Sequence, residues 1–444
     1  DVFVIGSGMA GMNIANRCAG KGLKVGVTDE LPYGGTCALR GCDPKKVLLG
    51  ATEALHLSQN LSEKNITSLP DINWEKAKEY KQEFVDSTPP KVEKGYEKNG
   101  IDTFHQPAKF ISKNQLQVGD ETIEADKFAI ATGAKPLELN IPGGNLALTS
   151  TDFLNFDHLP ESLLFIGGGY IAFEFAHIAA RFGSKVTIIH RGSRPLENFD
   201  PFIVEQLTKA TKELDIDLVL ETDVTAIEKT AKGFKVTGKS QNKEQNWEAE
   251  QVINSAGRPP AIFDLDLEKA DINYGKHGIE VNKYLQNTSN PRVYAAGDAA
   301  DTNGIPLTPV AVMEGHIVTS NIIKGNYKEA DYSGIPTVVF TLPTMTSVGL
   351  TEEEAQAQHL DFTVKKKSVP GWFTAKRINE KTYAFKTLIE KGSGKIIGAH
   401  LIGPHAEEVI NLFAMAIKAN WTALDIKTMI LTYPSASSDM VYMV

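Results

Sequence analysis

Two cysteines lie five positions apart near the start of the chain, in the stretch "GGTCALRGCDPKK" from Gly34 to Lys46. Cys37 and Cys42 are two of only three cysteines in 444 residues. Thiols at this spacing can bind a metal, form a structural disulfide, or open and close as a redox pair. Structural zinc requires four nitrogen or sulfur ligands, usually in two close pairs, and no histidine lies nearby. A metal site is therefore not expected.

The spacing itself favours a redox pair over a structural bridge. On a regular helix, residues five apart have Cα atoms about 8.6 Å apart, whereas a disulfide requires less than about 7 Å. A Cys37–Cys42 bond therefore requires a break in the helix, which Gly41 can provide. A disulfide that closes so short a ring adds little stability through loop closure. In a reducing cell, a bridge here is therefore more plausible as a redox-active disulfide than as a structural one. Nearby charges include three cations that favour a thiolate and one anion that opposes it: Arg40, Lys45, Lys46 and Asp43.

The composition sets limits on partners and compartment. The net charge of -9 argues against nonspecific nucleic-acid binding, which needs a basic surface. No apolar run reaches the roughly 18 residues of a membrane span, so no membrane partner is expected. Three cysteines are too few for a disulfide scaffold, which predicts a reducing, cytoplasmic location. A length of 444 residues predicts two to four domains.

The element order before the cysteines is typical of a dinucleotide-binding fold. An apolar strand at Val2–Ile5 is followed by Gly6, Gly8 and Gly11 in G-x-G-x-x-G spacing, then a helix and a second strand ending on Asp29. The glycines allow a tight turn and a close approach of the backbone to a pyrophosphate, which faces the helix N-terminus. Asp29 can accept hydrogen bonds from ribose hydroxyls.

The same pattern recurs, which predicts a second nucleotide. The strand Leu163–Ile166 precedes Gly167 and Gly169, and a helix then leads to the strand Val186–Ile189. The second strand ends in cations rather than an acid. Cations here favour the 2′-phosphate of NADPH over the hydroxyl of NADH, although Glu197 opposes them. The cations are His190, Arg191 and Arg194.

Two further strands are expected to return to the first nucleotide. "FAIATGAKP" ends a buried strand at Thr132 and Gly133, and "RVYAAGDAA" ends one at Gly297 and Asp298. An aspartate after such a turn can reach a ribityl or pyrophosphate group. The chain then ends in antiparallel strands, "TVVFTLP", "YAFKTLIEK" and "KIIGAHLIG", with an amphipathic helix in "HAEEVINLFAMAIKA".

We therefore predict an α/β chain with two Rossmann-like dinucleotide-binding domains and a C-terminal α+β domain. The predicted boundaries are 1–140 with 262–330 for the first domain, 141–261 for the second, and 331–444 for the C-terminal domain.

These motifs resemble, in order and over nearly the whole chain, the flavoprotein pyridine nucleotide-disulfide oxidoreductases, which include glutathione reductase, dihydrolipoamide dehydrogenase and mercuric reductase. The segments are "GGTCALRGCDPKK", "GGGYIAFE", "ATGAKP", "INSAGRPP", "AAGDAA", "PLTPVA" and "PTVVFTLPTMTSVGLTEEEA". The resemblance implies that residues 1–140 and 262–330 form the FAD-binding domain and that residues 141–261 form the NAD(P)H-binding domain, with NADPH as the nucleotide and NADH possible. It also implies that residues 331–444 form a dimer-interface domain, and hence a homodimer.

The resemblance also implies roles for individual residues. Cys37 would attack the substrate, and Cys42 would lie beside the flavin. Lys45 would lie near flavin N5 and pair with Glu174, and Tyr170 would gate the nicotinamide pocket. The remaining residues in matching motifs are implied to contact a cofactor: Gly35, Thr36, Gly257 and Arg258.

The C-terminal tail departs from the family pattern. Where the family has His-Pro-Thr and then Glu, reaching across the dimer with the acid–base His, this chain has "TYPSASSD". Tyr433 replaces the His, Ser435 the Thr and Ser438 the Glu. A tyrosine has a pKa near 10, so Tyr433 is a poor base at neutral pH but can donate a proton. Glutathione and lipoamide are therefore doubtful substrates.

Three functional hypotheses follow. The first is an enzyme that passes electrons from NADPH through FAD to the Cys37–Cys42 pair and on to an unidentified disulfide or other acceptor. The second is a cysteine-independent diaphorase that reduces quinones, dyes or metal ions. The third is a flavin-based redox sensor or interaction protein whose cysteine pair switches conformation.

Overall fold

The computed structural model describes residues 1–62, 64–241 and 243–444, which form two compact units. The first unit comprises Asp1–Val47, Lys78–Leu137 and Gly257–Tyr332. The second comprises Leu48–Ala77, Glu138–Ala256 and Ser333–Val444. Helices α3 (Cys42–Leu61) and α4 (Trp74–Asp86) contain two of the points at which the chain passes from one unit to the other.

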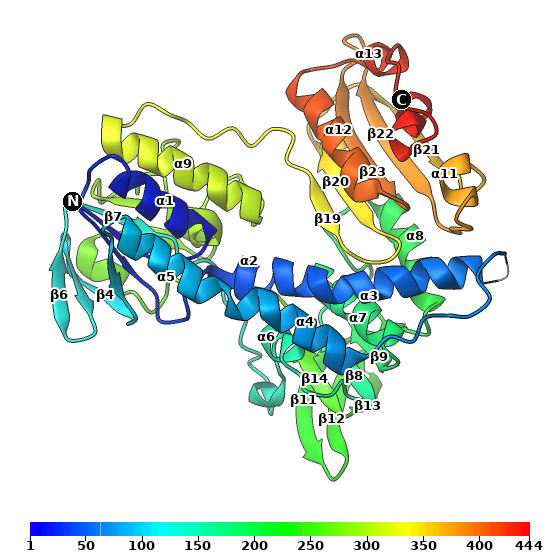
Figure 1. Ribbon diagram of the computed structural model, residues 1–444, viewed down its shortest axis with the longest axis horizontal. Coiled ribbons are helices and arrows are strands. Elements are labelled where there is room, and N and C mark those ends of the chain that lie inside the picture. Colours follow the sequence, from blue (N-terminus) through cyan, green and yellow to red (C-terminus); the bar gives the residue numbers. More distant parts are fainter. Residues whose placement is uncertain (63, 242) are drawn as a thin grey trace. The chain divides into compact units, whose positions relative to one another are not determined.

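The first unit is built on a five-stranded parallel sheet in the order β17-β7-β1-β2-β3. Its strands are β1 (Val2–Ile5), β2 (Val25–Thr28), β3 (Asp102–Phe104), β7 (Lys127–Ile130) and β17 (Val293–Ala295). Val4 pairs with Val27, and both are fully buried, as expected for a parallel sheet covered on both faces. Helices α1 (Met9–Ala19) and α9 (Thr308–Lys324) lie side by side in this unit (Figure 1).

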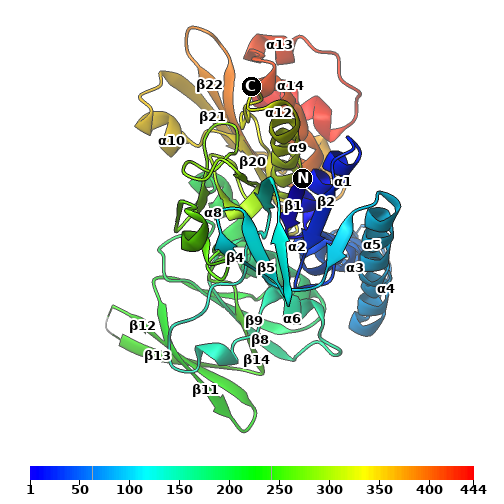
Figure 2. The same ribbon diagram turned by 90° about the vertical axis from the view of Figure 1, so that its left-hand side faces the viewer.

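The remaining elements of the first unit are short. They are α2 (Gly35–Arg40), α5 (Thr88–Lys98), β4 (Ala108–Ser112), β5 (Gln115–Val118), β6 (Glu121–Glu124), η2 (Leu267–Ala270), β15 (Tyr274–Gly275), β16 (Gly278–Glu280), η3 (Gly297–Ala299) and β18 (Ala300–Asp301). Strands β4, β5 and β6 form a separate antiparallel sheet, drawn in cyan in Figure 2.

The second unit holds a four-stranded parallel sheet in the order β10-β9-β8-β14. Its strands are β8 (Ser162–Ile166), β9 (Lys185–Ile189), β10 (Asp217–Val219) and β14 (Gln251–Asn254). The accompanying helices are η1 (Gly144–Leu146), α6 (Ser150–Leu154), α7 (Tyr170–Arg181) and α8 (Pro201–Lys212). An antiparallel sheet of β11 (Asp223–Thr230), β12 (Gly233–Ser240) and β13 (Lys243–Ala249) is inserted before β14 (Figure 2).

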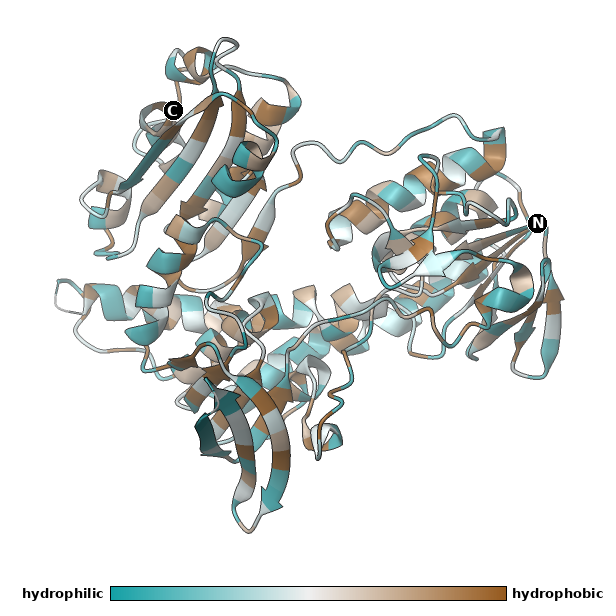
Figure 3. Ribbon diagram, turned by 180° about the vertical axis from the view of Figure 1, so that it is seen from behind, coloured by the Kyte–Doolittle hydropathy of each residue, from teal (hydrophilic) through white to brown (hydrophobic). Residues whose placement is uncertain are grey.

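The C-terminal part of the second unit is an antiparallel sheet in the order β19-β20-β23-β22-β21. Its strands are β19 (Thr337–Val339), β20 (Met345–Gly349), β21 (Phe362–Ser368), β22 (Ala384–Glu390) and β23 (Ile396–Ile402). Its helices are α10 (Glu352–Ala357), α11 (Phe373–Lys376), α12 (Ala406–Lys418), α13 (Ala423–Lys427), η4 (Ala436–Asp439) and α14 (Met440–Met443). The buried face of α12 carries Val409 and Phe413, and apolar residues mark the sheet in Figure 3.

The predicted fold class is confirmed: two parallel, Rossmann-like sheets and a C-terminal α+β domain are present. The strands expected at Val2–Ile5 and near 163–166 and 186–189 form as β1, β8 and β9. The division into three domains with ends at 140, 261 and 330 stays a prediction.

Candidate functional site

The cysteine pair lies at a break between two helices. Cys37 is in α2, which ends before Gly41, and Cys42 is the first residue of α3. A Cβ atom on Gly41 would lie 3.0 Å from the carbonyl oxygen of Thr36, so a larger residue would crowd the turn. Both cysteines are free thiols, Cys37 half-buried and Cys42 exposed.

The two thiols have opposite proton affinities. The hydrogen bond with Cys37 is the largest cause that lowers the pKa of Cys42 to about 6, and Thr308 and the Lys45 charge also lower it. The same hydrogen bond, followed by burial, raises the pKa of Cys37. A proton shared by the pair therefore stays on Cys37, and Cys42 is a thiolate at neutral pH.

Thr308 is a site residue that the sequence reasoning did not single out. Its Oγ1 lies 3.7 Å from the Sγ of Cys42. It is the first residue of α9 and belongs to the motif "PLTPVA". The sequence did contain a signal for this residue: a hydroxyl side chain beside a proline at the start of a helix, inside a motif that matches the family.

Glycines bring the first nucleotide loop and the cysteine loop into close backbone contact. Gly6 has φ +103°, and a Cβ there would lie 2.3 Å from the carbonyl oxygen of Ala131. Gly35 has φ +71°, and a Cβ there would lie 2.4 Å from the Cα of Gly8. Gly11 likewise packs against Gly6 O. Side chains at these positions would push the packed backbone segments apart and disrupt the turn that the Rossmann motif uses to approach a pyrophosphate.

The Asp29 carboxylate holds this loop together through three hydrogen bonds. Its Oδ2 accepts hydrogen bonds from the Ser7 N–H at 2.8 Å and the Ser7 hydroxyl at 2.6 Å, and its Oδ1 accepts from the Leu31 N–H at 3.0 Å. The carboxylate is therefore pre-oriented, and a ribose hydroxyl would share it with Ser7.

The two returning strands bring Thr132 and Asp298 into the same unit. Among the described residues, the buried Thr132 hydroxyl has no hydrogen-bond partner. Burial raises the pKa of Asp298, and the charge of Arg258 partly opposes this. Gly133 and Gly297 both adopt positive φ, and the Gly297 N–H donates to Glu314 Oε2 at 2.6 Å. An orphaned hydroxyl, a buried acid and a glycine cradle fit the polar groups of FAD.

Arg258 belongs with these first-fold residues. Its Nη2 donates to the Ala134 carbonyl, and the neighbouring Gly257, with φ +139°, accepts from the Leu137 N–H at 3.0 Å. The preceding strand β14 lies in the second unit, whereas Gly257 begins a segment of the first. The structure thus groups Arg258 with Asp298.

The second glycine turn has the same construction as the first. Gly167 has φ +110°, and a Cβ there would lie 2.5 Å from the Ser255 carbonyl oxygen. Gly169 precedes α7, whose first residue, Tyr170, is 47% exposed. An exposed aromatic ring at a helix start beside the glycine turn is available to cover a nicotinamide.

His190 is used within its own loop. Its Nδ1 accepts from the Gly168 N–H at 3.1 Å, and its Nε2 lies 3.0 Å from the Arg194 carbonyl oxygen and 3.3 Å from Glu197 Oε1. With Nδ1 accepting, Nε2 is placed to donate to the Arg194 carbonyl oxygen and to Glu197 Oε1. Arg191 is exposed just after the strand, and binding of a 2′-phosphate by His190, Arg191 and Arg194 stays a prediction.

Lys45 and Glu174 are both buried ionisable side chains, 6% and 5% exposed. Glu174, in α7, accepts a hydrogen bond from the Phe340 N–H at 2.7 Å. Lys45, in the first turn of α3, lowers the pKa of Cys42 by its charge. The two belong to different compact units, so their pairing stays a prediction.

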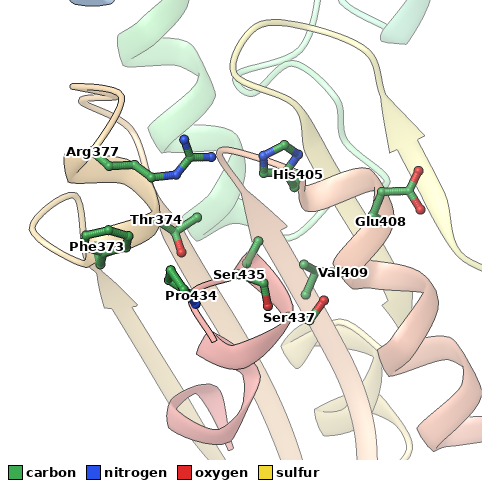
Figure 4. Close-up of a pocket in the computed structure, with 10 residues that line it drawn as sticks. Phe373, Thr374, Arg377, His405, Glu408, Val409, Pro434, Ser435 and Ser437 are labelled. Atoms are coloured by element: carbon green, nitrogen blue, oxygen red, sulfur yellow. The ribbon is translucent and has the colours of Figure 1, made fainter. Parts of the chain in front are cut away.

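The C-terminal tail borders a pocket of about 600 Å³ in the second unit (Figure 4). Tyr433 is 75% exposed and its ring centre lies 6.4 Å from that of Phe373. Figure 4 shows Arg377 and His405 across the pocket from Pro434 and Ser435. The lining residues are Phe373, Thr374, Arg377, His405, Glu408, Val409, Pro434, Ser435, Ala436 and Ser437.

Two of these lining residues, His405 and Glu408, were missed by the sequence reasoning. They lie at the start of α12, 28 and 25 positions before Tyr433, so no local pattern joined them to the tail. Within the tail, the Ser438 hydroxyl donates to the Ser435 carbonyl oxygen at 2.7 Å, and Asp439 Oδ2 accepts from the Tyr383 hydroxyl at 2.9 Å. The pocket therefore holds an imidazole and a carboxylate beside the tail.

The described residues contain neither a cluster of metal ligands nor a helix that could span a membrane. Within residues 1–62, 64–241 and 243–444, no group of three or more His, Cys, Asp or Glu side chains could hold a metal ion. In the same residues, none of the helices has both the length and the apolar character needed to cross a bilayer.

Comparisons with known proteins agree with this geometry. Residues 1–315 match the family described as pyridine nucleotide-disulphide oxidoreductase, and residues 335–444 match its dimerisation domain. The chain is 32% identical to a glutathione reductase of Burkholderia cepacia, over 99% of this chain and 97% of that one. It is 33% identical to a dihydrolipoyl dehydrogenase of Staphylococcus aureus, over 98% and 94%.

Solved structures are similar over the same length. The HOCl-induced flavoprotein disulfide reductase RclA from Escherichia coli superposes with a TM-score of 0.87 at 28% identity, covering 99% of this chain and 98% of that one. A second structure of that protein is described as its Cu(II) complex.

Proposed function

Because this chain belongs to the pyridine nucleotide-disulphide oxidoreductase family, we propose that it carries electrons from NADPH to the Cys37–Cys42 pair and on to an external acceptor. Family members use FAD and NAD(P)H, and the chain is an NAD(P)H-dependent flavoprotein oxidoreductase. FAD, when bound, accepts hydride from nicotinamide and delivers electrons to a disulfide. The redox role of the pair, the choice of NADPH and the acceptor are the proposal.

The observation that carries the proposal is the unequal acidity of the two thiols. Cys42, with its pKa lowered to about 6, is a thiolate at neutral pH, while Cys37 keeps the proton. A low-pKa thiol is the better leaving group when a disulfide is opened. Opening of the Cys37–Cys42 bond would therefore leave the negative charge on Cys42 and make Cys37 the thiol that meets the acceptor.

Neighbouring side chains support this division of roles. The Thr308 hydroxyl and the Lys45 charge both stabilise the Cys42 thiolate. Lys45 is buried, and a buried ammonium requires a partner, which Glu174 would supply. Cys37 is half-buried and must lose its proton to attack an acceptor, which calls for a base.

The base is where this chain differs from the pattern it resembles. We propose a homodimer, for which the match to a dimerisation domain is support, with the tail 431–444 facing the partner's cysteine pair. Tyr433 is a poor base near pH 7. His405, with Glu408 in the first turn of the same helix, lines the pocket that the tail borders and is the better candidate to take the proton from Cys37.

One observation favours a metal ion as the acceptor. A similar structure is a Cu(II) complex of an HOCl-induced reductase, and a pair of thiols is a soft donor set suited to copper. A cupric ion needs only electrons, so the missing family histidine would matter less. A disulfide with a low-pKa leaving thiol stays the alternative acceptor.

The experiment is anaerobic titration of the FAD-loaded protein with NADPH, followed by turnover assays of the wild type and Cys37→Ser. The expected result is uptake of two electron pairs per FAD and loss of acceptor turnover in Cys37→Ser. Full turnover by Cys37→Ser with quinones or cupric ion would instead identify a cysteine-independent diaphorase. A single, non-turning-over response to NADPH would identify a sensor.

A further inference from the structure

An acidic helix start from the C-terminal part of the chain lies against the loop that follows β9. Arg194 Nη1 lies 3.4 Å from Glu353 Oε1, and the two side chains are 30% and 63% exposed. The other end of the guanidinium, Nη2, donates to the Glu197 carbonyl oxygen at 3.0 Å. Arg194, which the sequence assigns to a 2′-phosphate, is therefore held by an ion pair with a residue 159 positions later.

A bridge centred on the buried Lys386 holds Glu352, the residue directly before Glu353. Lys386 Nζ lies 2.6 Å from Asp200 Oδ2 and 2.6 Å from Glu352 Oε2, and Lys386 and Asp200 are 4% and 0% exposed. Asp200 also caps α8 by accepting from the Phe202 N–H, directly after the loop that contains Arg194.

The helix start itself is closed by a capping box. The Thr351 hydroxyl accepts from the Glu354 N–H, and the Glu354 carboxylate accepts from the Thr351 N–H at 2.8 Å. The side chains of Glu352 and Glu354 are thus both committed to holding the turn. Glu353 is left pointing at Arg194, and it is the member of the three that can exchange its partner.

We infer that Glu353 is a selectivity residue for the nicotinamide nucleotide, acting through Arg194. The Glu353 carboxylate pairs with the guanidinium that a 2′-phosphate would bind, so the phosphate must displace the carboxylate from Arg194. A nucleotide without a 2′-phosphate does not compete for Arg194 and is unaffected. This inference rests on the proposed use of NADPH and adds to it a residue of the dimerisation domain that tunes the preference.

Electrostatics decide which partner prevails. A 2′-phosphate carries nearly two charges and three acceptor oxygens, and it pairs with a guanidinium more strongly than one exposed carboxylate does. Glu353 therefore weakens NADPH binding without blocking it. Exposed ion pairs contribute little free energy, so removing the Glu353 carboxylate is expected to strengthen 2′-phosphate binding by only about two- to fivefold.

The test is Glu353→Gln in the FAD-loaded protein, measured by calorimetric titration with adenosine 2′,5′-bisphosphate and, separately, adenosine 5′-monophosphate. We expect the affinity for the bisphosphate to rise about two- to fivefold and that for the monophosphate to stay constant. Asp361→Asn is the matched control, since it removes one exposed carboxylate, paired with Lys391, from the same domain.

Arg194→Ala completes the test as a double-variant cycle, because Glu353→Gln should have no effect once Arg194 is absent. An unchanged bisphosphate affinity in Glu353→Gln, an equal rise for both nucleotides, or an equal gain in Asp361→Asn would each overturn the inference. The wild-type ratio of the two affinities separately tests the proposed NADPH preference. A ratio near one with a gain in Glu353→Gln would refute that preference and support the selectivity role.

Discussion

The Sγ atom of Cys42 lies 3.7 Å from the Oγ1 atom of Thr308, a residue 266 positions later in the chain. This contact joins the N-terminus of α3 to the first turn of α9 and places a hydroxyl donor on the more acidic thiol. The acidity of Cys42 thus depends on a segment far from the cysteine motif.

Removing this hydroxyl is expected to raise the pKa of Cys42. In Thr308→Val the pKa should rise from about 6 by about one unit, because a hydrogen bond to a charged group is lost. The thiolate fraction grows as pH rises through the pKa, so alkylation of Cys42 by iodoacetamide should be slower in the variant at pH 6. Thr308→Ser keeps the donor and serves as the control. An identical midpoint in all three proteins would contradict the role of Thr308.

Replacing each cysteine should give opposite spectra. If Cys42 is the thiol beside the flavin, two-electron reduction gives a long-wavelength absorbance band from its thiolate. Cys42→Ser should abolish the band, and Cys37→Ser should make it permanent, because no disulfide can form. The measurement is absorbance above the flavin band under anaerobic NADPH titration. A band insensitive to both changes would refute the assignment.

The arginines after β9 should determine nucleotide choice. We expect NADPH to reduce the flavin with a several-fold to a hundred-fold preference over NADH, from about 1–3 kcal/mol of charge-assisted hydrogen bonds. Arg191→Ala and Arg194→Ala should each reduce kcat/KM for NADPH and leave that for NADH unchanged. Lys209→Ala, which removes an exposed cation paired with Glu205 on α8, is the control. Equal losses for both nucleotides would contradict a 2′-phosphate contact.

The tail and the pocket can be separated by their pH profiles. We expect weak reduction of glutathione, lipoamide and thioredoxin at pH 7 by the unaltered protein. His405→Gln should reduce disulfide turnover by about 10²–10⁴-fold and remove the ascending limb of the pH profile, as loss of a general base does. Tyr433→Phe should alter turnover less, and Tyr433→His should increase it. Rapid glutathione reduction that persists in both His405→Gln and Tyr433→Phe would show that another base exists.

A buried charge network in the second unit should dominate its stability. His56 Nε2 lies 2.7 Å from Glu380 Oε2, while Arg181 Nη2 contacts His56 Nδ1 at 3.3 Å and donates to the Leu342 carbonyl at 2.8 Å. Glu380 is 7% exposed. Glu380→Gln should reduce the free energy of unfolding by about 3–5 kcal/mol, because it leaves a buried guanidinium uncompensated. Urea unfolding measures this loss of free energy. The control is Glu75→Gln, which removes a carboxylate from the exposed Glu75–His158 pair and should have a small effect.

The same carboxylate predicts a pH dependence. Burial raises the pKa of Glu380, but hydrogen bonds and the charge of His56 outweigh it, and the net pKa is lowered. A carboxylate with a lowered folded-state pKa contributes stability above its unfolded pKa, near 4.3, and loses it as pH falls through the folded value. Wild type and Glu380→Gln should therefore differ by a constant amount near neutral pH and converge in stability as pH falls below about 4.3 and through the folded pKa of Glu380. A stability difference that stays constant far below about pH 4.3 would exclude this contribution.

Local patterns in the sequence predicted most of the fold. The strands expected at 2–5, 163–166 and 186–189, the two glycine turns and the helix that follows each are specified within about 30 residues, and they form where expected. The parallel strands β3, β10 and β14 were not expected. The helix break at Gly41 was predicted from the length of a disulfide alone. Such features follow from backbone geometry and the period of apolar residues, which a short segment contains completely.

Contacts between distant segments could not be predicted in this way. Thr308 acts on Cys42, and Glu353 acts on Arg194, through side chains whose proximity is created by the tertiary fold. His190 was singled out as a cation near a 2′-phosphate, and no local pattern indicated that the Gly168 N–H and the Arg194 carbonyl oxygen lie against its two ring nitrogens. Residue type indicated what each group can do, and only the fold determined which partner it has.

The buried Asp200–Lys386–Glu352 bridge means that the second nucleotide fold and the C-terminal sheet are not interchangeable modules. A chimera carrying a relative's C-terminal domain without a lysine at this place would leave the Asp200 carboxylate buried and uncompensated. The cap of α8, which Asp200 makes through Oδ1 to the Phe202 N–H, would remain, but the charge of the carboxylate would lose its partner. A domain exchange between relatives would therefore have to move three parts together. These are Lys386, the acidic first turn of α10, and the loop between β9 and α8 that they hold.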